Sequence, residues 1–194
     1  MKKSTTLTTI AAIATAGALA LSGCTDSPDE DESPPQSQDQ TQTKSPSSES
    51  HAHAADGGQP PKGIKKAADP KYAVGDDVVL TADHMEGMEG ADATISGAFD
   101  TTTYSISYTP TDGGDPVTDH KWVVQEELEN PGKPPLKEGT EVVVDADHMP
   151  GMKGAKATID SSTDETVYMV DLDMGDMTMT NHKWVTESEI QPAK

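Results

Sequence analysis

One imidazole and two thioether groups recur within five residues at two places in the chain. Residues 83–91 read DHMEGMEGA, and residues 147–155 repeat this segment as DHMPGMKGA. Imidazole and thioether groups are soft ligands that suit a soft cation such as Cu(I). The predicted copper ligands of the two HMxGM motifs are His84, Met85, Met88, His148, Met149 and Met152.

The glycine inside each motif permits a tight turn, because glycine adopts left-handed backbone conformations without steric cost. Such a turn at Gly87 could bring Met88 back beside His84, and the same holds for the second copy. A different interpretation is also open. Methionine fills small, irregular cores, and the two motif histidines could be half-buried residues that bond a backbone carbonyl.

A second group of methionines is confined to the C-terminal part of the chain. Residues 173–182 read DMGDMTMTNH, which is typical of methionine-rich copper-binding runs in which many weak thioether ligands act together. Met174, Met177 and Met179 are therefore further predicted ligands, and period-two alternation predicts that Met169 points outward. The alternative is a hydrophobic hairpin.

Two HKW motifs also recur, at residues 120–122 and 182–184. Trp122 and Trp184 are predicted core residues. His120 and His182 join the predicted metal ligands only if the fold brings them near the HMxGM motifs.

These motifs belong to an internal tandem repeat, with the first copy at residues 71–130 and the second at residues 136–192. The motif histidines are offset by 64 residues and the HKW motifs by 62, so the second copy lacks two residues near the segment that corresponds to residues 111–115. The proline-rich segment 130–135 joins the copies as a short, stiff linker.

Short β-branched runs and alternating segments predict strands in each copy. Residues 78–80 and 142–144 are β-branched or aliphatic, and residues 104–108 and 168–172 alternate between apolar and polar. A helical turn is expected at the end of each copy. Four or five strands in about sixty residues suit a small barrel, so the predicted fold is all-β, with two tandem small SH3-like barrels after a disordered tether.

The N-terminal part of the chain predicts export and lipid anchoring. Residues 1–23 combine two lysines with a short apolar run and end before Cys24, which is the single cysteine and the predicted lipidation site. Residues 24–70 are rich in polar and acidic residues, which predicts a disordered tether. Within the tether, residues 51–53 (HAH) could bind a metal weakly or could simply be part of a polar tail.

Charge and motif content argue against several classes of function. The formal net charge is −20 and the basic residues are all lysines, so nucleic acid is not an expected partner. The chain contains no GxSxG, HExxH or glycine-rich phosphate-binding motif, so no enzymatic activity is expected.

The lipidation motif, the acidic tether and the two copies that run from ADHMxGMxGAxATI to HKW resemble the YdhK-type bacterial lipoproteins, the family of domain of unknown function 1541. This resemblance, which extends to the CopL-type surface lipoproteins described as copper binders, implies a protein anchored to the cell membrane through lipid on Cys24 that faces the extracytoplasmic side, sequesters Cu(I) and contributes to copper tolerance. A copper exporter or oxidase is the expected protein partner. The alternative function is a structural or adhesion lipoprotein whose SH3-like barrels bind cell-wall polymer or a protein.

Overall fold

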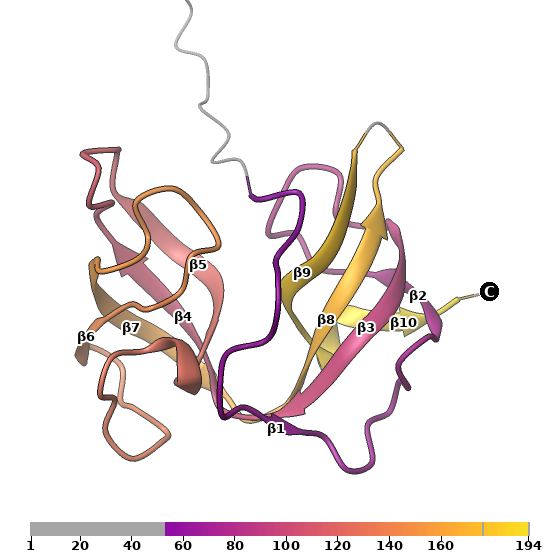
Figure 1. Ribbon diagram of the computed structural model, residues 1–194, viewed down its shortest axis with the longest axis horizontal. Coiled ribbons are helices and arrows are strands. Elements are labelled where there is room, and N and C mark those ends of the chain that lie inside the picture. The colour runs from indigo at the N-terminus through magenta and orange to yellow at the C-terminus, as the bar shows by residue number, and fades with distance from the viewer. Residues whose placement is uncertain (1–52, 176, 194) are drawn as a thin grey trace, which may run out of the picture. The chain divides into compact units, whose positions relative to one another are not determined.

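The computed structural model describes residues 53–175 and 177–193, and in these residues the chain forms two β-sheets with two short 3-10 helices (Figure 1). The predicted signal segment, Cys24 and most of the predicted tether lie outside the described residues. No helix in the described ranges is long and apolar enough to cross a membrane. The expectation of an all-β protein is confirmed.

The first sheet has the strand order β10-β2-β3-β8-β9, and β1 pairs with the end of β3. All its pairings are antiparallel. Its strands are β1 (Lys65–Lys66), β2 (Asp77–Leu80), β3 (Asp92–Asp100), β8 (Thr166–Asp173), β9 (Thr178–Thr186) and β10 (Ile190–Pro192).

The second sheet has the strand order β5-β4-β7-β6, again with antiparallel pairing. Its strands are β4 (Thr103–Tyr108), β5 (Val117–Val124), β6 (Glu141–Val143) and β7 (Lys156–Thr163). A 3-10 helix follows the last long strand of each repeat, where a helical turn is expected: η1 (Gln125–Glu127) follows β5, and η2 (Glu187–Glu189) follows β9.

The two repeats exchange halves. The first repeat contributes β2 and β3 to one sheet and β4 and β5 to the other, and the second repeat does the same with β8 and β9 on one side and β6 and β7 on the other. The prediction of two barrels, one for each repeat, is therefore wrong, and neither sheet closes on itself among the described residues. Segments 101–102 and 164–165 carry the chain from sheet to sheet instead of turning it back as a hairpin.

The two crossing segments contact each other. The hydroxyl of Thr102 donates a hydrogen bond of 2.6 Å to Oδ1 of Asp164, and the carbonyl of Thr102 accepts one of 2.9 Å from the backbone N–H of Gln125. β3 and β4 do not pair with each other as the strands of a hairpin would, because they belong to different sheets. Each strand pairs with a strand of the other repeat, as in β3 with β8 and β4 with β7.

Each sheet has a hydrophobic core built from both repeats. In the first sheet, Leu80 and Ile95 of the first repeat pack with Val170 and Val185 of the second. In the second sheet, Ile106 of the first repeat belongs to one core with residues of the second, such as Val144 and Ile159. Burial of each full aliphatic side chain contributes about 1.5–3 kcal/mol, so each core draws its stabilisation from both repeats.

A third cluster joins the two sheets through Phe99, Val124, Val167, Met169 and Trp184. The expectation that Met169 points outward is therefore wrong, because this cluster covers the second face of β8 and leaves Met169 only 2% exposed. The prediction that Trp184 is a core residue is confirmed, and Trp122 is half-buried.

Residues 53–70, which were expected to be part of the disordered tether, lie along the folded part of the chain. The indigo segment at the start of the described chain runs between β5 and β9 before it reaches β1 (Figure 1). Asp56 pairs with Thr180, and Lys65 and Lys66 pair with the end of β3. Backbone hydrogen bonds therefore order a segment that has few apolar side chains.

The exchange predicts that cleavage of the inter-repeat linker will not separate the repeats. A protease site introduced at Gly132 and Lys133 and then cut should leave one species on size-exclusion chromatography, because the cut breaks no strand pairing and both cores are shared. The same nicked sample in denaturant should give two fragments. Elution of two fragments in native buffer would contradict the exchanged topology.

Candidate metal centre

Both HMxGM segments form the tight turn that their glycines predict. The N–H of Met88 donates to the carbonyl of Met85 at 3.2 Å, and the corresponding bond from Met152 to Met149 has the same length. Gly87 has a φ of +83° and Gly151 one of +73°, values that favour glycine. The segments are therefore turns that follow β2 and β6.

The turn directs the second methionine of each motif into a core rather than toward its histidine. Met88 and Met152 are each 0% exposed, Met88 in the core of the first sheet and Met152 in the core of the second. Met149 and Met179 are also buried in these cores. This packing favours the alternative in which these four thioethers fill the cores.

The histidine of each HMxGM motif binds a carboxylate of the other repeat. Nε2 of His84 lies 2.7 Å from Oε1 of Glu189, and Nε2 of His148 lies 2.8 Å from Oε1 of Glu127. The side chains of both histidines are almost fully buried, at 3% and 6% exposed. The strand exchange makes these pairs, because η1 and η2 each end beside the loop of the opposite repeat.

Each carboxylate also accepts a hydrogen bond from an indole N–H. Trp122 donates to Oε2 of Glu189 at 3.0 Å, and Trp184 donates to Oε2 of Glu127 at 2.8 Å. Backbone N–H groups of Thr186 and Val124 donate to the same two carboxylates. Both carboxylates are thus held by one imidazole, one indole and one backbone amide, and Glu189 also accepts a hydrogen bond of 3.0 Å from the hydroxyl of Thr186.

These donors keep the carboxylates ionised. Burial alone would raise the pKa of Glu189, but its hydrogen bonds with His84, Thr186 and Trp122 lower that pKa to about 2. Burial of Glu127 acts in the same upward direction, and the contacts with His148 and Trp184 outweigh it, so the pKa of Glu127 is also lowered. An ionised carboxylate can only accept, so Nε2 of each paired imidazole carries the hydrogen.

This tautomer leaves Nδ1 of His84 and Nδ1 of His148 as lone-pair nitrogens. Both atoms are buried and have no hydrogen-bond partner among residues 53–175 and 177–193, and the same is true of Nε2 of His120. A buried polar atom without a partner costs about 1–3 kcal/mol. Three imidazole nitrogens in this condition, all within one region, indicate a site that a ligand could complete.

The HKW histidines lie in that same region. The rings of His120 and His148 have centroids 6.2 Å apart, and the ring of His53 lies 6.0 Å from His120 and 5.3 Å from His182. His84 is close enough that a positive charge on its ring would disfavour protonation of His120 and His182. Five of the six histidines of the chain therefore gather between the sheets, which we call the imidazole cluster: His53, His84, His120, His148 and His182.

Two members of the imidazole cluster, His120 and His182, are uncharged in the folded protein near neutral pH. Burial is the largest cause, and repulsion from neighbouring imidazoles adds to it, so the pKa of His120 and the pKa of His182 are each lowered to about 3. Neutral imidazole is the form that binds metals. As the side chains stand, no three His, Cys, Asp or Glu residues in the described part of the chain form a metal-binding arrangement.

Three methionines retain access to solvent or to the edge of a core. Met85 and Met174 are half-buried against the core of the first sheet, and Met177 is 48% exposed. The backbone N–H of Met174 donates to the carbonyl of Met177 at 2.9 Å. A Cβ built on Gly87 would lie 3.9 Å from the sulfur of Met174, so the first HMxGM loop lies beside the methionine-rich hairpin of the second repeat.

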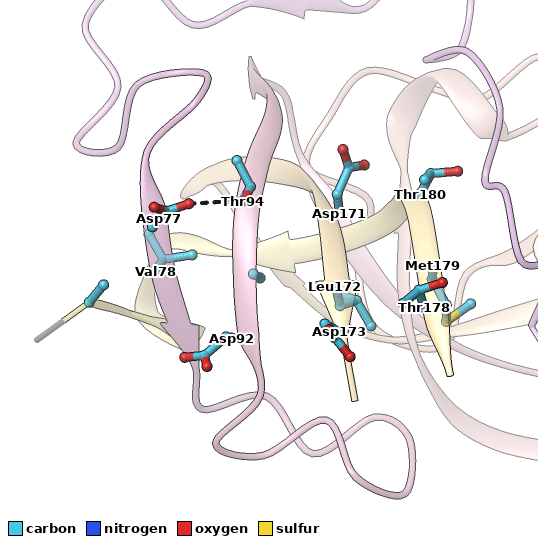
Figure 2. A pocket seen from close by; sticks show the side chains of 12 residues that line it. Asp77, Val78, Asp92, Thr94, Asp171, Leu172, Asp173, Thr178, Met179 and Thr180 are labelled. Carbon is cyan, nitrogen blue, oxygen red and sulfur yellow. Dashed lines mark hydrogen bonds between the residues drawn. The ribbon is translucent and has the colours of Figure 1, made fainter. Parts of the chain in front are cut away.

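The first sheet also carries a shallow acidic hollow of about 570 Å³. Figure 2 shows its lining side chains, most of which come from β2, β3, β8 and β9. Among them, the hydroxyl of Thr94 donates a hydrogen bond to Asp77. Its carboxylates, which include Asp92, Asp171 and Asp173, are exposed to solvent. A solvated acidic face accounts for this hollow, and we assign it no ligand.

Sequence reasoning missed two residues of the cluster region, Glu127 and Glu189, and left His53 open between a weak metal ligand and part of a polar tail. A signal for the two glutamates was present, because each follows the histidine of its HKW motif by seven residues and they share the 62-residue offset. His53 lies in the HAH segment of the polar tail, where composition predicts disorder, so the sequence carried no sign of its contacts with the HKW histidines.

Comparison with known proteins gives relatives over both repeats. The family model described as "Protein of unknown function (DUF1541)" matches residues 74–125 and 138–187. "Uncharacterized protein YdhK" of Bacillus subtilis (strain 168) is 51% identical over 132 residues, which are 67% of this chain and 64% of that protein. The chain thus spans slightly less than two thirds of this relative's length.

Solved structures from the same organism are also similar. The crystal structure of a DUF1541 family protein (ydhK) from Bacillus subtilis subsp. subtilis strain 168 has a TM-score of 0.68 and 48% identity, covering 70% of this chain and 94% of that one. The solution NMR structure of the ydhK C-terminal domain from B. subtilis has a TM-score of 0.59 and 51% identity, covering 62% and 92%.

The lowered histidine pKa values predict loss of stability in mild acid for the metal-free protein. As the pH falls from 6 to 5, the unfolded state protonates His120 and His182 (ordinary pKa 6.5) but the folded state does not (pKa about 3), so the free energy of unfolding falls. Each imidazole contributes at most about 1.4 kcal/mol per pH unit. Urea unfolding at a series of pH values measures this slope.

The substitution His182→Gln should make the dependence of the unfolding free energy on pH shallower, by up to the contribution of one imidazole, about 1.4 kcal/mol per pH unit. Glu189 does not interfere in this window, because its stabilisation is present above pH 4.5 and is lost only as the pH falls from there toward 2. A slope that His182→Gln leaves unchanged would show that His182 is not buried in its neutral form.

Proposed function

The chain belongs to the DUF1541 family, and we propose that it is a lipid-anchored, extracytoplasmic protein that binds copper as Cu(I) and contributes to copper tolerance. The observation that carries this proposal is the set of buried imidazole nitrogens without partners: Nδ1 of His84, Nδ1 of His148 and Nε2 of His120. We propose binding rather than catalysis because the site consists of imidazole nitrogens that can donate to a metal, and no nucleophile lies among them.

The carboxylate contacts support a metal-binding role for His84 and His148. Histidines that bind metals commonly donate their second ring N–H to a carboxylate, which fixes the tautomer and the ring orientation and makes the other nitrogen a stronger donor. Glu189 and Glu127 make this contact at 2.7 and 2.8 Å. These carboxylate contacts therefore support both histidines as proposed metal ligands.

The spacing of the imidazole rings suits ligands that share an ion. Two imidazoles bound to one metal at about 2.0 Å have ring centroids roughly 5 to 6.4 Å apart. His120 and His148 meet this requirement, because their ring centroids are 6.2 Å apart.

Copper is the metal that the remaining donors favour. Imidazole alone suits several transition metals, but thioether ligands select soft ions such as Cu(I). Met85, Met174 and Met177 form an accessible thioether group beside the first HMxGM loop. We propose this group as a second, weaker copper site and leave Met88, Met149, Met152 and Met179 as core residues.

Lipid anchoring through Cys24 and delivery of copper to an exporter or oxidase remain parts of the proposal that rest on the sequence. The finer fold class is a proposal as well: each sheet, with strands of both repeats, would correspond to one SH3-like unit whose halves are exchanged. In the competing function, a structural or adhesion lipoprotein, the imidazole cluster would serve only to join the sheets.

Copper affinity distinguishes histidine ligands from methionine ligands. The double variant His84→Gln with His148→Gln removes both free Nδ1 atoms but keeps an amide that can donate to each glutamate. We expect it to weaken the tightest Cu(I) binding by tenfold or more in competition with a colorimetric chelator. The matched control, Met88→Leu with Met152→Leu, keeps the side-chain volume at a cost below about 1.5 kcal/mol for each site and should bind like the wild type.

Loss of affinity in the methionine control with none in the histidine variant would reverse the ligand assignment. Absence of Cu(I) binding by the purified wild-type chain would refute the proposed function and favour the adhesion protein. Circular dichroism on each variant verifies that its sheets are intact.

The thioether group predicts a separate change in stoichiometry. Met85→Leu, Met174→Leu and Met177→Leu together should reduce the number of Cu(I) ions bound at saturation without altering the affinity of the tightest ion, because imidazoles rather than thioethers are proposed to hold that ion. Equilibrium dialysis with metal analysis measures this number. An unchanged number would exclude these methionines as copper ligands.

A further inference from the structure

The N-terminal segment 53–59, which we call the strap, is seated on the edge of the first sheet by backbone hydrogen bonds. The N–H of Gly57 donates to the carbonyl of Thr180 at 2.9 Å, and the N–H of Thr180 donates to the carbonyl of Ala55 at 2.9 Å. Asp56 and Thr180 thereby form a parallel bridge at the edge of β9. The strap extends the sheet at the edge that faces β5.

Side chains specify the position of the strap. Nδ2 of Asn181 donates to Oδ1 of Asp56 at 3.1 Å, and Nζ of Lys183 donates to the carbonyl of Gln59 at 2.7 Å. A Cβ on Gly57 would overlap the carbonyl oxygen of Asn181, so only glycine permits this close approach. These contacts fix the strap in one register along β9.

This register places the ring of His53 between strands of the two sheets. Its centroid lies 6.0 Å from that of His120 on β5 and 5.3 Å from that of His182 on β9. In Figure 1 the strap passes between these two strands. His53 is therefore the member of the imidazole cluster that comes from outside both repeats.

Hydrophobic burial does not account for this placement. Residues 53–59 read HAADGGQ, and their apolar side chains are limited to two alanines. Seating such a segment costs about 1–2 kcal/mol of backbone entropy for each residue, which a few hydrogen bonds at the sheet edge offset only in part. A segment of this kind opens more readily than the strands that it covers, and a ligand that bound His53 would hold it in place.

Resting on the proposed function, we propose that His53 is a further copper ligand, which the strap carries onto the site formed by His120 and His182. Binding of the ion then fastens the strap, and release of the strap exposes the site. The same imidazole on an unseated tail would be a weak, independent ligand, so tight binding requires both His53 and the seated strap.

The test measures Cu(I) affinity and dissociation rate for the purified full chain and three variants. His53→Gln removes the ligand but keeps the strap. Gly57→Val keeps the ligand but prevents seating of the strap against Asn181. His51→Gln is the matched control, because it removes the other imidazole of the same HAH segment. We expect His53→Gln and Gly57→Val each to raise the dissociation rate of the tightest copper ion by tenfold or more, with no change for His51→Gln.

The outcomes separate this proposal from the proposed function. If the wild-type chain binds no copper, the proposed function fails first. If the wild-type chain binds copper and His53→Gln binds it equally well, the proposed function stands and His53 is not a ligand. Equal losses for His51→Gln and His53→Gln would indicate a flexible chelating tail and overturn the seated strap. His53→Gln alters no core residue, so the test remains decisive even if Gly57→Val does not fold.

Discussion

The carboxylates of Glu127, which is buried, and Glu189, which is half-buried, make the contacts on which the arrangement of the two repeats depends. Each carboxylate lies at the end of one repeat and binds the histidine and tryptophan of the other, at distances between 2.7 and 3.0 Å. A buried carboxylate that lost these partners would carry an uncompensated charge, at a cost of about 3–5 kcal/mol. The same contacts leave Nδ1 of each paired histidine as a donor, so the interaction that joins the repeats also prepares the proposed metal ligands.

Local pattern predicted the elements but could not predict how they pair. The alternation of Tyr168, Val170 and Leu172 requires a buried face and says nothing about which strand supplies the neighbour. Tyr104 and Ile106 of the first repeat would pair equally well with β3 of the same repeat or with β7 of the other. The length of the crossing segments does not decide the matter, because a two-residue connection is compatible with both a hairpin and a crossing.

The candidate site was predicted in part for the same reason. Sequence singled out His84, His148, His120 and His182 as donors, and the structure gathers them in one region together with His53. It did not single out the partners, since Glu189 is 105 residues from His84 and contacts of that range have no local signal. Met88 was equally ambiguous, because a thioether beside a glycine turn can face an ion or fill a core, and only the position of the turn relative to the sheet decides between them.

Exchange of halves also gives a duplicated chain a way to become asymmetric. Each HMxGM loop faces a hairpin of the opposite repeat: the first loop lies beside Met174, whereas in the second a Cβ on Gly151 would lie 2.7 Å from Pro110 and 2.5 Å from Asp112. The methionine-rich hairpin of the second repeat thus adds thioethers to a loop of the first. The hairpin of the first repeat has no methionine and adds none. Substitutions in one hairpin therefore change the surroundings of one HMxGM loop. They do not replace His84 or His148, which pair with glutamates of the opposite repeat.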